Sequence, residues 1–490
     1  MKNFAIKFYD QSLAILWVLY ILALPFTSSP LVAKLLGGTM VAAPSGLILF
    51  ALLIVWLLPK LWQGMTIPQH TLSLFLFILI ALISIITGYW RNIPAFKGIN
   101  PIKENLEGII TLVMGICFYF VSYLWLREKN QKKEFNKTLR LITYAGIIIF
   151  IKAFLEIVLW RFYGRYPYWF ETAHDLLVTG PLFENRISAF AFEPSWLANQ
   201  LNLLFLPYWL ASTFTRTTAF KIQVWKFHVE DLCLILGSVV LFFTLSRLGY
   251  LSFLLMLGIL IIKGTVWFSD WLQEKILKKI PRFEKKTFKV ILSVFIYSIV
   301  FLFYVGLVFT AAYALNLFDS RNADIFNILL GDFELKRYAE NLGFGARLAY
   351  WTGGWNIFTR FPFLGVGLGN AGFYFPEKLP SSAWHLVEVR KYFYETNMLL
   401  NVKSMGFRLL AETGILGFSA FITFLTIIFL IILRLLFAKN KFKQFMGWMG
   451  LFTFCAFIIE QLSLDSFALP YFWVTFGMIT AANEIELKNN

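Results

Sequence analysis

Residues 72–90 read LSLFLFILIALISIITGYW, a run without one charged side chain. A helix needs about 20 mostly apolar residues to cross a bilayer, and this run is long enough. Similar runs recur along the chain, which is 59% hydrophobic and 15% charged over 490 residues. Soluble domains are about 25% charged. The composition therefore excludes an ordinary soluble enzyme, a coiled coil or a disordered chain.

The hydropathy pattern predicts an all-α polytopic membrane protein with about twelve transmembrane helices, and we treat residues 1–490 as a single transmembrane domain. The pairs of spans that meet at Arg247 and at Ser466 are joined by very short turns. The expected spans begin near Ser12, Val41, Leu72, Gly108, Leu141, Phe190, Asp231, Leu248, Val290, Arg408, Met446 and Ala468.

The distribution of charge sets the expected topology. The formal net charge is +16. With the N-terminus inside, the predicted cytoplasmic loops carry a clear excess of Lys and Arg, and the outer segments are nearly neutral, as the positive-inside rule requires. We therefore expect a multi-pass membrane protein with both termini in the cytoplasm. A nucleic-acid partner is not expected, because the basic residues are scattered over short loops instead of being gathered on one domain.

One segment departs from the pattern of short connections. Residues 314–404, between the ninth and tenth spans, are polar yet rich in aromatic residues and glycine. The topology places this segment outside the cytoplasm, and long loops of this kind are usually functional. Its aromatic faces suit the stacking of sugar rings, and an interfacial aromatic belt is the alternative interpretation.

Ionisable residues at membrane depth are costly, so they are candidates for function. Arg247 lies at the outer tip between two apolar spans, where it either meets a phosphate or snorkels to cap the turn. Arg186 is followed by Glu193 and Pro194 at the start of another span. Glu193 is either part of a site or a helix cap.

Two further charged positions follow in the C-terminal half. Arg347 lies in an amphipathic stretch before a glycine-rich segment, residues 360–370. Its bare GxGxG pattern is a weak phosphate-loop signal and is better interpreted as a tight turn where backbones approach closely. Arg408 and Glu412 have i,i+4 spacing, which predicts an ion pair on one helix face. That pair is interpreted as structural, and direct catalysis is the alternative.

Together these elements resemble a known family, the O-antigen ligase and polymerase superfamily of bacterial envelope enzymes. The resemblance covers about residues 185–417 by motif, and the whole chain by span count. Four motifs carry it, in this order: Thr244-Leu-Ser-Arg247, Arg347-Leu-Ala-Tyr-Trp351, Pro362-Phe-Leu-Gly-Val-Gly-Leu-Gly-Asn370 and Leu410-Ala-Glu-Thr-Gly-Ile-Leu-Gly417.

The resemblance implies a GT-C-like glycosyltransferase that takes a glycan from undecaprenyl diphosphate on the outer leaflet. Its transfer is metal-independent and inverting, with arginines holding the diphosphate. Ligase-like members carry His-Asn shortly before the Ala-Glu-Thr-Gly element, where this chain has Lys403 and Ser404. This difference favours a polymerase of O-antigen or exopolysaccharide repeat units over a ligase. A lipid-linked glycan flippase or transporter is a further alternative, and a chain-length regulator is a further expected partner.

The expected roles of individual residues follow from this mechanism. Arg186, Arg247 and Arg347 would bind the diphosphate and neutralise its developing charge. The acceptor is a sugar hydroxyl, which benefits from a general base within hydrogen-bond reach. The candidates for that base are Glu193, His385 and Glu395. Neither a metal nor another cofactor is expected, since the sequence shows no ligand cluster on the outer side.

Overall fold

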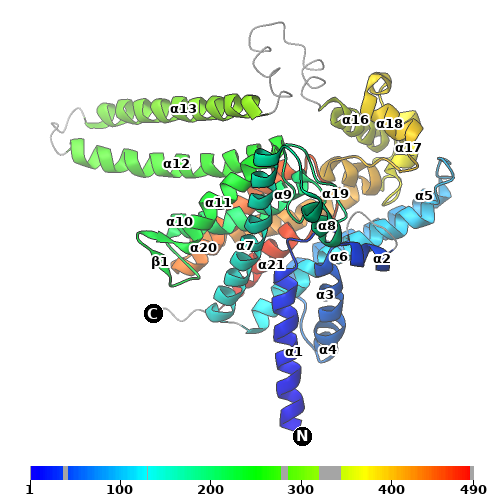
Figure 1. Cartoon of the computed structure of the whole chain (residues 1–490), viewed down its shortest axis with the longest axis horizontal. Coiled ribbons are helices and arrows are strands. Elements are labelled where there is room, and N and C mark those ends of the chain that lie inside the picture. The colour runs from blue at the N-terminus through cyan, green and yellow to red at the C-terminus, as the bar shows by residue number, and fades with distance from the viewer. Residues whose placement is uncertain (1, 37–41, 130, 278–284, 319–343, 486–490) are drawn as a thin grey trace. The chain divides into compact units, whose positions relative to one another are not determined.

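The computed structural model describes residues 2–36, 42–129, 131–277, 285–318 and 344–485 (Figure 1). These residues divide into two compact units. The first comprises Met1–Gly249 with Ala346–Asn490, and the second is Tyr250–Gly345. Residues 319–343, in the expected outer segment 314–404, lie outside the described residues. The candidate site belongs to the first unit.

Helices dominate the described parts of the chain, and the expected all-α polytopic class is confirmed. Eight helical stretches among the described residues are long and apolar enough to cross a membrane. They are Pro44–Trp62 (α3, η1 and α4), Gln69–Trp90 (η2 and α5), Pro101–Lys129 (α6), Lys132–Tyr163 (α7), Arg247–Lys275 in α12 (Arg247–Leu277), Lys289–Gly306 in α13 (Lys285–Phe318), Met405–Leu436 (α19) and Lys441–Glu460 (α20).

The other four expected spans fall on helices outside this set of eight. These are α1 (Lys2–Leu22), the rod made of α9 (Pro194–Gln200), η3 (Leu201–Phe205) and α10 (Leu206–Thr215), α11 (Val229–Phe243) and α21 (Tyr471–Glu484). Pro207 lies in the rod and lacks an N–H, and the wider π-type turn of η3 comes directly before α10. Such a turn lets the helix continue past a proline. All twelve expected spans therefore fall on helical segments.

The first unit is held together by close approaches between helices. A Cβ atom on Gly115 of α6 would lie 2.4 Å from the indole nitrogen of Trp473 in α21, and one on Gly477 would lie 2.7 Å from the Tyr119 carbonyl oxygen. The Trp473 indole donates to the Phe467 carbonyl at 2.9 Å. Inside a bilayer, lipid tails are as apolar as leucine, so small residues that permit such dispersion contacts stabilise the packing.

A layer of short helices covers the start of α19. It contains α16 (Gly345–Arg360), α17 (Ala371–Lys378), η5 (Ser381–His385) and α18 (Val387–Glu395), which surround their own apolar core (Figure 1). The glycine-rich segment joins this layer to α19. The Val366 N–H donates to the Ala411 carbonyl at 3.0 Å, and the Gly367 N–H donates to that of Glu412 at 2.9 Å. A Cβ on Gly365 would lie 2.4 Å from the Glu412 carbonyl carbon, so the expected close backbone approach is confirmed.

The remaining elements of the first unit connect the spans. They include α2 (Pro30–Leu36), α8 (Tyr168–Leu177) and a two-stranded antiparallel hairpin, β1 (Gln223–Val224) and β2 (Phe227–His228). The second unit pairs α12 with α13. There the Tyr304 hydroxyl donates to the Leu254 carbonyl at 2.9 Å, and the Gln273 amide donates to the Ser293 hydroxyl at 2.6 Å.

Candidate functional site

The turn between α11 and α12 brings two of the expected arginines to one place. Arg247 is the first residue of α12. The Arg186 guanidinium donates from Nε to the Thr244 carbonyl at 3.0 Å, and the next residue, Ile187, donates its N–H to the Phe243 carbonyl at 3.2 Å. Leu245 adopts a left-handed conformation with φ of 49°, which sharpens the turn. Arg186 is therefore bound to the same turn that carries Arg247.

A buried carboxylate is linked to this turn. Glu460, the last residue of α20, is only 3% exposed. The Asn202 amide donates to Glu460 Oε1 at 2.9 Å and to the Gly249 carbonyl at 2.9 Å. The Asn199 amide donates to Glu460 Oε2 at 3.4 Å. Because Gly249 lies two residues after Arg247, this amide network connects Glu460 to the arginine-bearing turn.

Arg347 extends the cluster to the covering layer of short helices. It lies in the first turn of α16 and is half-buried. Burial lowers the pKa of its guanidinium, whereas the carboxylates of Glu388, Glu193 and Glu460 act in the opposite direction. Arginine keeps its charge even so, since its pKa starts far above neutrality. Arg347 is thus a partly desolvated cation in the field of carboxylates from three other helices.

Glu193 occupies the N-cap position of α9 in an extended conformation, but its side chain makes no capping hydrogen bond. Its carboxylate instead accepts a hydrogen bond from the Ser195 hydroxyl. Glu193 thus occupies the cap position that the sequence predicts, but its side chain does not bond the backbone N–H groups of the helix. We refer below to the candidate site as the set Arg186, Glu193, Arg247, Arg347 and Glu460.

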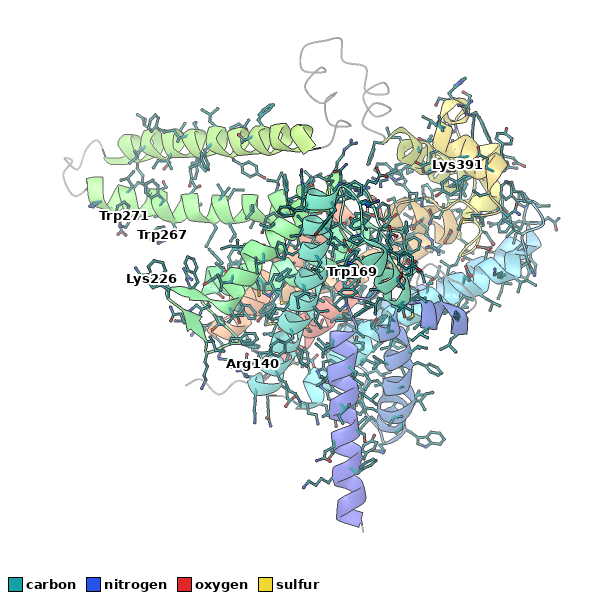
Figure 2. The ribbon with its side chains drawn as sticks, in the orientation of Figure 1. Arg140, Trp169, Lys226, Trp267, Trp271 and Lys391 are labelled. Atoms are coloured by element: carbon teal, nitrogen blue, oxygen red, sulfur yellow. The ribbon has the colours of Figure 1, made fainter. Side chains whose placement is uncertain are left out.

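The two other candidate bases lie elsewhere on the surface. His385, at the end of η5, and Glu395, at the end of α18, are both exposed. Neither is among the groups that act on Arg347, whereas Glu388 in the first turn of α18 is. The same exposed layer carries Lys391, and α8 carries Trp169, whose side chain is 59% exposed (Figure 2).

Arg408 and Glu412 form a second polar cluster beside the glycine-rich segment. Arg408 Nε donates to Glu412 Oε2 at 2.9 Å, and its NH1 donates to the Asp465 carbonyl at 2.7 Å. The Asp465 carboxylate accepts from the Lys403 backbone N–H at 3.1 Å. These contacts fix the segment before α19, which includes Lys403 and Ser404. Among the described residues, no three His, Cys, Asp or Glu side chains are grouped so that they could hold a metal ion.

A comparison with known protein families gives the same assignment as the motifs. Residues 232–422 match the family model described as O-antigen ligase. This match, which covers less than half of the chain, supports the resemblance of residues 232–422 to the O-antigen ligase and polymerase superfamily. The match includes Arg247, Arg347, Arg408 and Glu412, and it spans the turn after α11 and the start of α19. No curated protein matches the sequence.

Sequence reasoning missed three residues of the candidate site or its support: Glu460, Asn199 and Asn202. Glu460 follows two isoleucines at the end of an apolar run, and Asn199 and Asn202 lie inside another. Glu460 is itself an ionisable residue at membrane depth, so the same signal that singles out the arginines also identifies it from the sequence. The two asparagines gave no comparable signal, since neutral amides are common at helix interfaces in membranes.

Proposed function

We propose that this protein polymerises undecaprenyl-diphosphate-linked oligosaccharide repeat units, of an O-antigen or exopolysaccharide, at the outer face of the bacterial inner membrane. The observations that support this proposal are that Arg186 binds the turn carrying Arg247, and that the carboxylates of Glu193 and Glu460 act on Arg347. These five residues come from four separate segments of the chain. Cations held in a partly buried site stabilise a diphosphate anion far better than cations in water.

The proposed reaction is a metal-independent inverting transfer. The hydroxyl of the acceptor repeat unit attacks the anomeric carbon of the donor glycan on the face opposite the diphosphate. The bond from that carbon to the phosphate oxygen breaks, and its electron pair leaves with undecaprenyl diphosphate. The arginines neutralise the charge that develops on the leaving group. The hydroxyl proton passes to a carboxylate. Of the three candidate bases Glu193, His385 and Glu395, Glu193 is preferred because it alone is among the groups that act on the Arg347 guanidinium.

The proposal also states which side of the membrane each part of the chain faces. The positive-inside pattern supports cytoplasmic termini and an active site on the opposite side. The test is a cysteine placed at Tyr168, on exposed α8, and another at Lys226, next to the β1–β2 hairpin, each labelled with a membrane-impermeant maleimide in whole cells. We expect labelling at position 168 only. Labelling at position 226 only would reverse the topology.

A ligase that hands the glycan to lipid A-core or protein is the second candidate, because the matching family model is described as O-antigen ligase. Lys403 and Ser404 replace the His-Asn pair that ligase-like members carry. The Lys403 backbone is left-handed, with φ of 58°, and is held by Asp465, so a side chain at this position projects from a fixed segment. Restoring histidine there would thus present an imidazole without remodelling the loop.

The deciding experiment is gene deletion and complementation, with surface and lipid-linked glycans resolved by size. A polymerase deletion leaves single repeat units, and the ladder returns with the wild-type gene. Accumulation of long unattached lipid-linked polymer would identify a ligase instead. If lipid-linked units fail to reach the outer leaflet at all, the protein is a flippase. Coexpression with a chain-length regulator is expected to shift the modal length of the ladder without abolishing it.

A further inference from the structure

A buried polar group on α7 and α8 has no part in the proposed reaction. It consists of Lys152 and Glu156, one turn apart on α7, and His174 on α8, and we refer to these three residues as the clamp. Their side chains are almost completely buried. Lys152 Nζ lies 3.4 Å from Glu156 Oε1 and 2.8 Å from His174 Nδ1. Burying ionisable groups costs desolvation free energy, so a buried group of this kind is a candidate for a structural or functional role.

The clamp holds the backbone of residues 185–193, which we call the site loop because it carries Arg186 and Glu193. Glu156 Oε2 accepts the N–H of Ser188 at 2.9 Å and that of Ala189 at 3.1 Å. Lys152 Nζ donates to the Ala189 carbonyl. The clamp therefore engages Ala189 through both its donor and its acceptor.

Ala189 needs such support because its φ is 47°, in the left-handed region that non-glycine residues rarely adopt. The loop is also fixed on either side of the clamp. The Phe192 N–H donates to the Thr27 hydroxyl at 2.7 Å, and the Ile187 N–H donates to the Phe243 carbonyl at 3.2 Å. A change at Ala189 would therefore alter how Arg186 and Glu193 are spaced relative to each other.

His174 acts in this group as a neutral ring. Burial and the neighbouring Lys152 lower its pKa to about 4. Its Nε2 donates to the Gly180 carbonyl at 2.7 Å, which leaves Nδ1 to accept from the Lys152 ammonium. The histidine thus completes the hydrogen bonds of Lys152 without adding charge.

We propose that Lys152, Glu156 and His174 are positioning residues that keep the site loop in the conformation that places Arg186 and Glu193 in the glycan-transfer site. This inference rests on the proposed function. A misplacement of about 1 Å can reduce turnover by about 100-fold, so the loss of a backbone anchor is expected to appear in catalysis even where the protein still folds.

The main test is a double-mutant cycle between Glu156→Gln and Arg186→Ala, measured as turnover and KM of the purified full-length protein with lipid-linked repeat units. If Glu156 acts through the site loop, Glu156→Gln lowers turnover by about 10-fold in the wild type and by a smaller factor in the Arg186→Ala background, where only the placement of Glu193 remains to be disturbed. Fully additive losses would overturn the inference.

Glu230 offers a matched control. It is as buried as Glu156 and likewise accepts two backbone N–H groups, from Ala219 at 2.7 Å and Phe220 at 3.2 Å, in a different loop. Glu230→Gln is expected to lower the melting temperature about as much as Glu156→Gln while leaving turnover within about 2-fold of wild type. Equal losses of turnover in the two variants would mean that Glu156 has only a general structural role.

Two variants at His174 distinguish a positioning role of this residue from a role in proton transfer. Glutamine has one acceptor and one donor group and can replace both hydrogen bonds, so His174→Gln should retain most turnover and His174→Phe should lose it. An inactive but folded His174→Gln variant would contradict a purely positioning role.

Hydrogen exchange of the Ser188 and Ala189 amides gives a readout that does not need activity. We expect exchange about 10-fold faster in Glu156→Gln, with unchanged exchange around Ala219. If Arg186→Ala has no effect on turnover, the proposed role of Arg186 fails, and the exchange data alone decide whether the clamp holds the loop. Unchanged exchange at both the Ser188 and the Ala189 amide would overturn the inference that the clamp holds the site loop.

Discussion

Two buried carboxylates anchor two loops by the same chemistry, at opposite ends of the rod formed by α9, η3 and α10. Before the rod, Glu156 accepts two N–H groups of residues 185–193. After the rod, Glu230 accepts two N–H groups of residues 216–228, which include the β1–β2 hairpin (Figure 1). We call the segment 216–228 the hairpin loop. The two loops differ in what surrounds them.

The site loop contributes to a group of partly or fully buried charges, which includes Arg347 and Glu460. The basic residues of the hairpin loop point outward, with the Arg216 side chain 67% exposed and Lys226 on the surface (Figure 2). A buried carboxylate that satisfies backbone donors is thus a general means of building loops at the end of a membrane span. A half-buried arginine is present at both ends, since Arg140 donates to the Ala219 carbonyl at 2.7 Å. The end where chemistry is proposed differs in that its half-buried arginine, Arg347, is acted on by three carboxylates.

The largest expected effect is at Arg347. Arg347→Ala should reduce polymerisation by about 100-fold or more, since removing one group that stabilises developing negative charge typically costs that much. Turnover of the purified enzyme measures it. Lys226→Ala, which removes an exposed cation beside the other loop, should leave turnover within about 2-fold. If both variants lose activity alike, the contrast between the two ends does not hold.

A smaller effect is expected at Glu460. Glu460→Gln keeps the size of the side chain but removes one of the negative charges that act on Arg347, and it weakens the contact with Asn202. We expect a loss of about 10-fold in turnover, equivalent to about 1.4 kcal/mol in the activation barrier. Glu230→Gln is the control at the other end. An unaffected Glu460→Gln variant would remove Glu460 from the site.

The clamp also predicts a pH dependence of stability at the site-loop end. The pKa of His174 is lowered in the folded protein to about 4, so the unfolded chain binds more protons between that value and about 6.5. Stability contributed by the neutral ring is present above pH 6.5 and is lost as the pH falls. Between pH 7 and pH 5 we expect a loss of about 2 kcal/mol, measured by denaturant unfolding. His174→Gln should lose less over the same range, and an equal loss would exclude His174 as its source.

The smallest expected effect is at Arg216. Its guanidinium lies 3.4 Å from Asp231 Oδ2, but the arginine side chain is largely exposed. Exposed pairs contribute about 0–1 kcal/mol. Arg216→Ala should therefore change the free energy of unfolding by less than about 1 kcal/mol and leave turnover unchanged. A larger loss of unfolding free energy, or a loss of turnover, would show that the hairpin loop contributes to stability or activity beyond connecting two helices.

The sequence predicted the location of the spans well, because an apolar run is a local property. It predicted the glycine-rich turn for the same reason. It did not predict that Asn202 would join Glu460 to Gly249, since these residues come from three helices far apart in the chain. Glu193 is a second residue whose side-chain contacts could not be predicted from its position in the sequence. Its position before Pro194 is equally typical of a helix cap, and only its packing reveals that the cap hydrogen bond is not made.

The central claim is that the chain itself transfers glycan between lipid-linked repeat units. The most direct test is to supply the purified protein, in liposomes without other proteins or metal ions, with undecaprenyl-diphosphate-linked repeat units. We predict a ladder of lengthening glycans together with released undecaprenyl diphosphate, and neither product with Arg247→Ala or Arg347→Ala. A wild-type protein that leaves single repeat units unchanged, or arginine variants that form the full ladder, would contradict the account.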